Sequence, residues 1–152
     1  MSGADGLAVR DSVECWIVGP DRADGRRVLL MRTAPSVVGD WPQFWQAVTG
    51  GMEAGEVPLD ACRREIREET GIDVAAERIS SLDLGLEIPV PAAGRLVRKR
   101  VFLAEVPGQP IAISPEHVDA RWVPTAEAEA MLYWETCRTA LTRVRETLGF
   151  GS

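Results

Sequence analysis

Residues 50–72 have the sequence GGMEAGEVPLDACRREIREETGI, which combines a well-marked helix with an unusual concentration of charge. Pro58 suits the first turn of a helix, because its missing N–H would have no partner there. Gly71 suits the position just after a helix ends. We therefore predict a helix over residues 57–70.

Three acidic residues of this helix, Glu65, Glu68 and Glu69, fall within an arc of roughly 100° of its circumference. Like charges at this spacing repel each other, so the carboxylates are either solvated or neutralised by a cation. Oxygen ligands on a rigid helix, with no His or Cys among them, suit Mg²⁺ or Mn²⁺. The alternative is a charged, solvated helix face. The helix docks on the core through an adjacent apolar stripe of Leu59, Cys62 and Ile66.

The composition indicates one compact domain with a real core, since the chain has 152 residues and 45% of them are hydrophobic. A net charge of −6 argues against nucleic-acid or anionic-membrane partners, which favour basic surfaces. The cysteines form no C-x-x-C pair, and their odd number leaves one unpaired in any disulfide scheme. With neither a leader nor a long apolar run, a reducing, cytoplasmic location is expected.

The order of elements predicts an α+β fold, a mixed sheet with helices packed on it. We expect residues 1–11 to be a flexible N-terminus and residues 12–150 to form a single domain. Runs typical of strands occur at residues 12–19, 27–32, 45–51, 79–90, 98–106 and 119–123. The first two are expected to form a hairpin. Thr125 is expected to cap a helix, and Gly149 to end the last one.

Residues 50–72 also resemble the Nudix box, G-x5-E-x7-R-E-U-x-E-E-x-G-U with U aliphatic, at every specified position. Seven fixed identities, each used at about 7%, would arise by chance in a chain of this size roughly once in a million. The resemblance implies a Nudix-type α/β/α sandwich. Such a fold has a mixed, curved sheet, a catalytic loop–helix–loop and C-terminal helices.

The resemblance implies a hydrolase that cleaves a pyrophosphate, with a divalent metal, in a nucleoside diphosphate linked to another group. Glu65 and Glu69 would be the principal metal ligands, and Glu68 a further ligand or the base that orients water. Gly50 and Glu116 would complete the ligand set, with Mg²⁺ the expected cofactor and Mn²⁺ a substitute. Glu68, Glu69 and Glu116 are thus the candidate catalytic carboxylates.

The same resemblance assigns supporting roles to other positions of the motif. Arg64, also counted as catalytic, would hold the box loop through Glu56. Glu56, Gly50 and Gly71 would be structural. The single histidine, His117, is a candidate general base, with a purely structural hydrogen-bonding role as the alternative.

Outside the box, FWQAVTGG and EHVDARW are similar to segments of the dihydroneopterin triphosphate pyrophosphatases within the Nudix superfamily. In those enzymes the residues matching Arg32 and Thr49 are expected near the substrate. Residues 87–99 depart from them, because this segment is short and has no aromatic residue. General nucleoside triphosphates and dinucleoside polyphosphates therefore stay open as substrates, as does an inactive nucleotide-binding module. The expected partner is a small phosphorylated molecule, and a homodimer stays open.

Two further clusters have both a functional and a structural interpretation. A basic group on the predicted hairpin could bind a polyphosphate tail or could lie on the solvated face of a strand; it consists of Arg95, Arg98, Lys99 and Arg100. An aromatic group could stack on a planar ring or could belong to the core; it consists of Trp41, Phe44 and Trp45.

Overall fold

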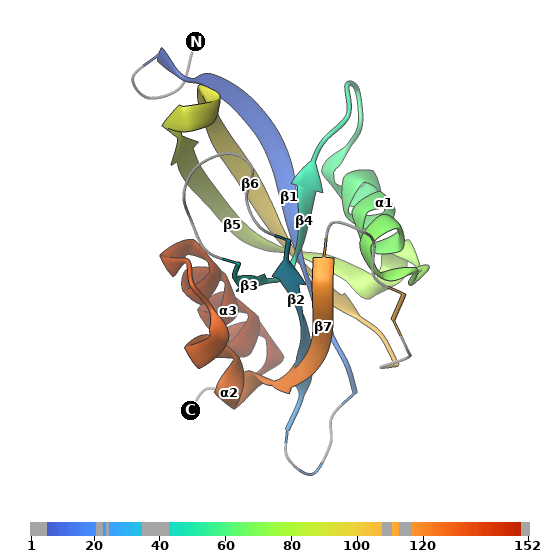
Figure 1. The fold of residues 1–152 in the computed structure, drawn as a ribbon. Coiled ribbons are helices and arrows are strands. Elements are labelled where there is room, and N and C mark those ends of the chain that lie inside the picture. Colours follow the sequence, from blue (N-terminus) through green and yellow to red (C-terminus); the bar gives the residue numbers. More distant parts are fainter. Residues whose placement is uncertain are drawn as a thin grey trace.

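A seven-stranded mixed sheet forms the centre of the fold, with helices on both of its faces (Figure 1). The computed structural model describes residues 6–20, 23, 25–34, 43–107, 111–112 and 117–149. The strands are β1 Ala8–Val18, β2 Arg27–Thr33, β3 Trp45–Gln46, β4 Val48–Gly51, β5 Ile79–Val90, β6 Arg95–Glu105 and β7 His117–Pro124. The helices are α1 Pro58–Thr70, α2 Thr125–Ala128 and α3 Glu135–Leu148, with 3-10 turns at Ala76–Arg78, Pro91–Ala93 and Glu129–Met131. The α+β class and the α/β/α layering are confirmed.

The strand order is β3-β2-β1-β6-β5, with β4 paired to β1 and β7 paired to β2. β1 and β6 run parallel along their whole length, whereas the other pairs are antiparallel. β1 and β2 are antiparallel as expected of a hairpin, but in the described part of the chain their pairing is limited to Val18 opposite Val28 and a hydrogen bond from the Gly19 N–H to the Arg27 carbonyl. Ser12–Cys15 pair instead with β4. The strand that begins the Nudix box therefore takes the place beside β1 that a longer hairpin would have used.

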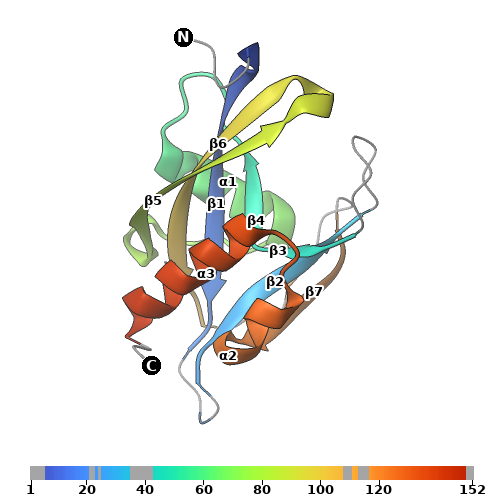
Figure 2. The same cartoon turned by 90° about the vertical axis from the view of Figure 1, so that its left-hand side faces the viewer.

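The core has two halves, one on each face of the sheet. Alternation along β1 decides which side chain enters which half, as expected for a pleated strand. Trp16 and Val18 lie on the face covered by α3, whereas Val13, Cys15 and Ile17 lie on the face covered by α1. Figure 2 shows α3 crossing the near face, with α1 behind the sheet. Both faces are buried, which explains why β1 is almost continuously apolar from Val13 onward.

Helix α1 confirms the prediction made from Pro58 and Gly71. The helix is held to the sheet by buried Ala61, Cys62 and Ile66. Gly71 has φ +77°, the left-handed conformation that ends helices, and its N–H donates to the Arg67 carbonyl at 2.9 Å.

The N-terminus of α1 lacks a side-chain cap. Val57 is the N-cap residue, with extended backbone, and its side chain cannot accept a hydrogen bond from the first turn. Because Val57 is 53% exposed, its replacement by threonine removes no core contact. We expect Val57→Thr to raise the free energy of unfolding by about 0.5–1 kcal/mol, with no loss of turnover. Urea denaturation measures this, and unchanged or lower stability would show that the hydroxyl does not cap the helix.

Several expectations about element boundaries were wrong. The strand predicted at residues 45–51 is divided at Ala47 into β3 and β4, and the strand predicted at 119–123 begins at His117. The first strand begins at Ala8, inside the segment expected to be flexible, because Ala8 starts a parallel ladder with β6. That ladder also extends β6 back to Arg95. Thr125 is the first residue of α2, not its cap, and is buried.

Across the described ranges, no helix is long and apolar enough to cross a membrane.

Candidate active site

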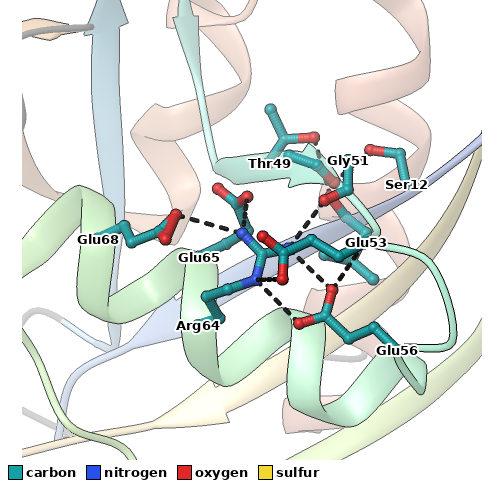
Figure 3. Close-up of polar contacts among 10 residues, drawn as sticks. Ser12, Thr49, Gly51, Glu53, Glu56, Arg64, Glu65 and Glu68 are labelled. Carbon is teal, nitrogen blue, oxygen red and sulfur yellow. Dashed lines mark hydrogen bonds and ion pairs between the residues drawn. The ribbon is translucent and has the colours of Figure 1, made fainter.

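The Arg64 guanidinium connects the loop before α1 to the acids of the helix (Figure 3). Its Nε and Nη2 donate to the two carboxylate oxygens of Glu56 at 2.8 and 2.9 Å, a bidentate pair. Nη2 also donates to the Gly51 carbonyl at 2.9 Å. Nη1 donates to Glu65 at 2.8 Å and to Glu68 at 3.2 Å. The predicted pairing of Arg64 with Glu56 is therefore present. The Arg64 guanidinium also connects the segment before the helix to two carboxylates of the helix.

Glu56 closes the loop as well as binding Arg64. Its Oε1 accepts a hydrogen bond from the Glu53 backbone N–H at 2.9 Å. The hydrogen bonds from Arg64 and from this N–H lower the pKa of Glu56 from 4.5 to about 2. Glu56 is thus a carboxylate at all ordinary pH values.

This low pKa predicts an acid-sensitive contribution of Glu56 to stability. A carboxyl with a pKa lower in the folded than in the unfolded chain stabilises above its unfolded pKa, and the contribution is lost as pH falls through its folded pKa. We expect wild type to be more stable than Glu56→Gln at pH 6, with the difference shrinking between about pH 4.5 and 2. Urea denaturation across this range measures it. A difference independent of pH would contradict the assignment.

Gly50 is required by close approach and not by an unusual backbone angle. A Cβ built on Gly50 would collide with the carboxylate of Glu65. The Gly50 carbonyl accepts a hydrogen bond from the Ser12 hydroxyl at 2.6 Å, which ties this end of β4 to β1. The motif thus places a helix carboxylate directly against the backbone of β4.

The other two helix acids differ in their environment. The side chain of Glu69 is 2% exposed and its Oε1 lies 3.6 Å from Nε2 of His117, which is itself buried. Glu68 has a side chain that is 57% exposed. His117 is therefore packed beneath the helix at the start of β7 and is not at a solvent-facing position.

The oxygen-only donor set fits a hard divalent cation chemically, since a rigid helix presents Glu65 and Glu69 and the Glu65 carboxylate lies against Gly50. Within the described ranges, however, no three or more Asp, Glu, His or Cys side chains are grouped to hold a metal. The expected convergence of the three glutamates is not formed by these residues alone, because Arg64 lies between Glu65 and Glu68 and binds both. Glu116 lies outside the described residues.

The two residues expected near the substrate lie on different strands. Thr49 is in β4 next to Gly50, and its hydroxyl donates to the Val13 carbonyl at 2.9 Å. Arg32 is exposed on β2, opposite Trp45 of β3. Arg32 has no ion pair with any residue in the described ranges.

The two described members of the aromatic group are both partly buried. Trp45 packs against the α3 half of the core, and Arg121 lies over its ring, 5.1 Å from the centroid. Phe44 contacts the rings of Tyr133 and Trp134. Trp41 lies outside the described residues.

The basic group does not lie on one solvated face. The side chain of Arg98 is 51% exposed and pairs with Glu87 at 3.4 Å, as expected of a solvated face. Lys99 instead turns inward, with a 13% exposed side chain whose Nζ lies 3.5 Å from the buried carboxylate of Glu14. Glu14 also accepts a hydrogen bond from the Trp16 indole at 2.8 Å. Glu14 was not identified from the sequence, although a charged residue within an apolar strand is the signal that could have revealed it.

Comparison with known proteins agrees with this architecture. The profile of the NUDIX domain family matches residues 10–142. The dihydroneopterin triphosphate diphosphatase of Escherichia coli K12 is 29% identical over 118 residues, which cover 71% of this chain and 75% of that protein. The solved structure of the E. coli dihydroneopterin triphosphate pyrophosphohydrolase superposes with a TM-score of 0.69 at 28% identity, covering 88% of this chain and 92% of that one.

A further solved structure is similar in fold alone. The MutT protein of Methanosarcina mazei superposes with a TM-score of 0.75 at 20% identity, covering 97% of this chain and 99% of that one. The complete motif, its Arg64-centred loop and these likenesses agree: the chain belongs to the NUDIX family of hydrolases that act on pyrophosphate bonds.

Proposed function

We propose that this chain hydrolyses a pyrophosphate bond in a small triphosphate that carries a planar heterocycle, with dihydroneopterin triphosphate as the leading substrate and Mg²⁺ as the cofactor. The observation that carries the proposal is the Arg64 network. It joins Gly51 at the end of β4 and Glu56 of the loop to Glu65 and Glu68 of the helix. The likeness to a dihydroneopterin triphosphate diphosphatase supports the choice of substrate.

Glu65 and Glu69 would hold the metal, with Glu68, Glu116 and the Gly50 carbonyl as further ligands. A bound Mg²⁺ neutralises phosphate oxygens and lowers the pKa of a bound water. The chain supplies rigidity, because Arg64 fixes Glu65 and the loop together before any substrate arrives. Mn²⁺ would substitute, since it accepts the same oxygen ligands.

In the reaction, the oxygen of a water attacks phosphorus and the bridging P–O bond breaks on the opposite side. A carboxylate takes the proton of the attacking water. Glu68 is the candidate base among the described residues, because its exposed carboxylate can reach solvent. Glu116 is the other candidate. Arg32, exposed on β2, would contact the phosphate chain or the group beyond it.

The test is a hydrolysis screen with identified products. Dihydroneopterin triphosphate, the common nucleoside triphosphates, sugar nucleotides and dinucleoside polyphosphates are incubated with the full chain and Mg²⁺, and phosphate and pyrophosphate are measured separately. Mg²⁺-dependent release from a triphosphate is expected, with the highest kcat/KM for dihydroneopterin triphosphate. A highest kcat/KM for a dinucleoside polyphosphate would replace the proposed substrate. Tight nucleotide binding without turnover would indicate an inactive binding module.

We place the protein in the cytoplasm. Cys15, Cys62 and Cys137 are buried free thiols, which are compatible with a reducing compartment.

A further inference from the structure

A pocket on the α3 face of the sheet has the size of one planar ring system. Its volume is about 180 Å³, and it lies between the β5–β6 hairpin, β3 and the start of α3. A cavity of about 150 Å³ accommodates benzene, so this pocket holds a ring but not a whole nucleotide. Its walls are apolar and aromatic, including Phe44, Trp134, Ile88 and Val97. Such walls suit the faces of a flat heterocycle.

The polar group that distinguishes this pocket is Lys99, the only lysine of the chain. An ammonium group carries three donors. Among the residues that the structure describes, Lys99 has one hydrogen-bond partner, Glu14. The Lys99 side chain is only 13% exposed, so water satisfies the remaining donors poorly. The pocket wall therefore presents a positioned cation with unused donors.

Glu14 explains how Lys99 is held there. The Glu14 carboxylate is 3% exposed and is fixed on its other side by the Trp16 indole N–H. Because Trp16 is fully buried in the core, its hydrogen bond restricts the position of this carboxylate. Glu14 is thus a positioning residue that keeps the Lys99 ammonium at the pocket wall.

The pocket lies within reach of the Nudix box. Gln46 lines the pocket, and Gly50 lies four residues further along the same extended segment. Four extended residues span at most about 14 Å. Among the strands described here β4 pairs only with β1, so its other edge is not covered by a strand. A ring in the pocket can therefore carry a phosphate chain to the helix that bears Glu65.

From these contacts we infer that Lys99 is a specificity-determining residue that donates a hydrogen bond to an oxo oxygen of a planar heterocycle bound in this pocket. Lysine has donors and no acceptor, so it favours a ring carbonyl over an exocyclic amino group at the same position. Pterins, hypoxanthine and guanine carry this oxo group on a pyrimidinone ring, whereas adenine carries an amino group there. The inference rests on the proposed function and narrows its substrate class to oxo-heterocycle triphosphates.

The test compares inosine triphosphate with adenosine triphosphate, which differ at position 6 of the purine by oxo against amino. For wild type, kcat/KM is expected to be at least about tenfold higher for inosine triphosphate than for adenosine triphosphate. A hydrogen bond from a charged donor contributes a difference of this size. Lys99→Met should reduce this ratio to near one. Arg98→Met is the matched control, because it removes a neighbouring positive charge from the opposite, exposed face of β6 and should leave the ratio unchanged.

A double variant and a substrate without a ring separate ring recognition by Lys99 from phosphate binding and from a folding defect. Lys99→Met leaves the buried Glu14 carboxylate without its cation, which can destabilise the fold. The double variant Glu14→Gln/Lys99→Met removes that charge and keeps an acceptor for the Trp16 indole. It should show the same loss of preference in a stably folded protein. Inorganic triphosphate has no ring, and its hydrolysis should be unaffected in both variants. An equal loss for inorganic triphosphate would show that Lys99 binds phosphate, and an equal loss for the two nucleotides would show a structural role. Either result overturns the inference.

Binding without metal separates this inference from the proposed function. Calorimetric titration of inosine and adenosine monophosphates in EDTA is expected to show tighter binding of the inosine form to wild type and equal binding to Lys99→Met. If no triphosphate is hydrolysed, the proposed function is wrong. The relative affinity for inosine and adenosine monophosphates then still tests the role of Lys99. Equal affinity of wild type for the two monophosphates would overturn the inference.

Discussion

Glu69→Gln is expected to lower kcat for the Mg²⁺-dependent hydrolysis by about 100- to 1000-fold while leaving the fold intact. Gln has nearly the volume of Glu, and the side chain is 2% exposed at the end of α1, so packing is preserved. The substitution removes one negative charge at a position proposed to hold the metal ion. Loss of a single electrostatic interaction in an active site commonly lowers kcat by a factor of this size. Steady-state kinetics with saturating Mg²⁺ measure the loss.

The matched control is Glu53→Gln, which removes an equal charge from the exposed box loop at a position the motif does not specify. The Glu53 side chain is 70% exposed and lies 3.8 Å from Arg64 Nε, beyond hydrogen-bond distance. It should retain activity within about threefold. Affinity for Mn²⁺, followed by calorimetry, should weaken at least about tenfold in Glu69→Gln and stay constant in Glu53→Gln. Activity near the wild-type level in Glu69→Gln would refute the metal assignment of this residue.

Arg64→Met is expected to destabilise the protein by about 2–4 kcal/mol and also to abolish most activity. The arginine side chain is 21% exposed and donates to three carboxylates and one backbone carbonyl. Its removal leaves Glu56 and Glu65, both largely buried, without their cation. The expected destabilisation is smaller than for a fully buried ion pair, because solvent reaches part of the network and screens its charges. Chemical denaturation at pH 7 measures the change.

Arg67→Met is the control for this prediction, since Arg67 is on the same helix, 59% exposed, with one ion pair to Asp73 at 3.9 Å. It should cost less than about 0.5 kcal/mol. The double variant Arg64→Met/Glu56→Gln should be less destabilised than the sum of the two single variants, because Glu56 is harmful only when it is charged and unpaired. Additive effects would show that the two side chains act independently.

Helix α1 illustrates what local sequence can determine. Pro58 and Gly71 bound it through backbone requirements that do not depend on the rest of the chain, and both ends were predicted within a residue. β5 was predicted at its observed bounds for a similar reason, because Pro91 and Gly94 follow it at a turn. The pairing of Arg64 with Glu56 also followed from the motif.

Other features depend on partners far away in the sequence. The start of β1 at Ala8 follows from the parallel ladder with β6, which no local pattern in a polar segment announces. The burial of Lys99 depends on Glu14, 85 positions earlier in the sequence. Because Lys99 lies among other basic residues, the sequence alone does not show that its side chain turns inward. Arg64 between Glu65 and Glu68 likewise shows that helical spacing alone does not fix where carboxylates converge.

The sequence by itself determined the class of reaction of this protein, because the Nudix motif specifies residue types at fixed spacing from the end of one strand through one loop and one helix. The tertiary structure alone decided where the motif sits and what surrounds it. Gly50 is essential because Glu65 comes from another element to lie against it, and Lys99 reaches a ring-sized pocket because the sheet joins β1 to β6. Spacing along a chain encodes local geometry, whereas contacts between strands depend on how the whole sheet pairs.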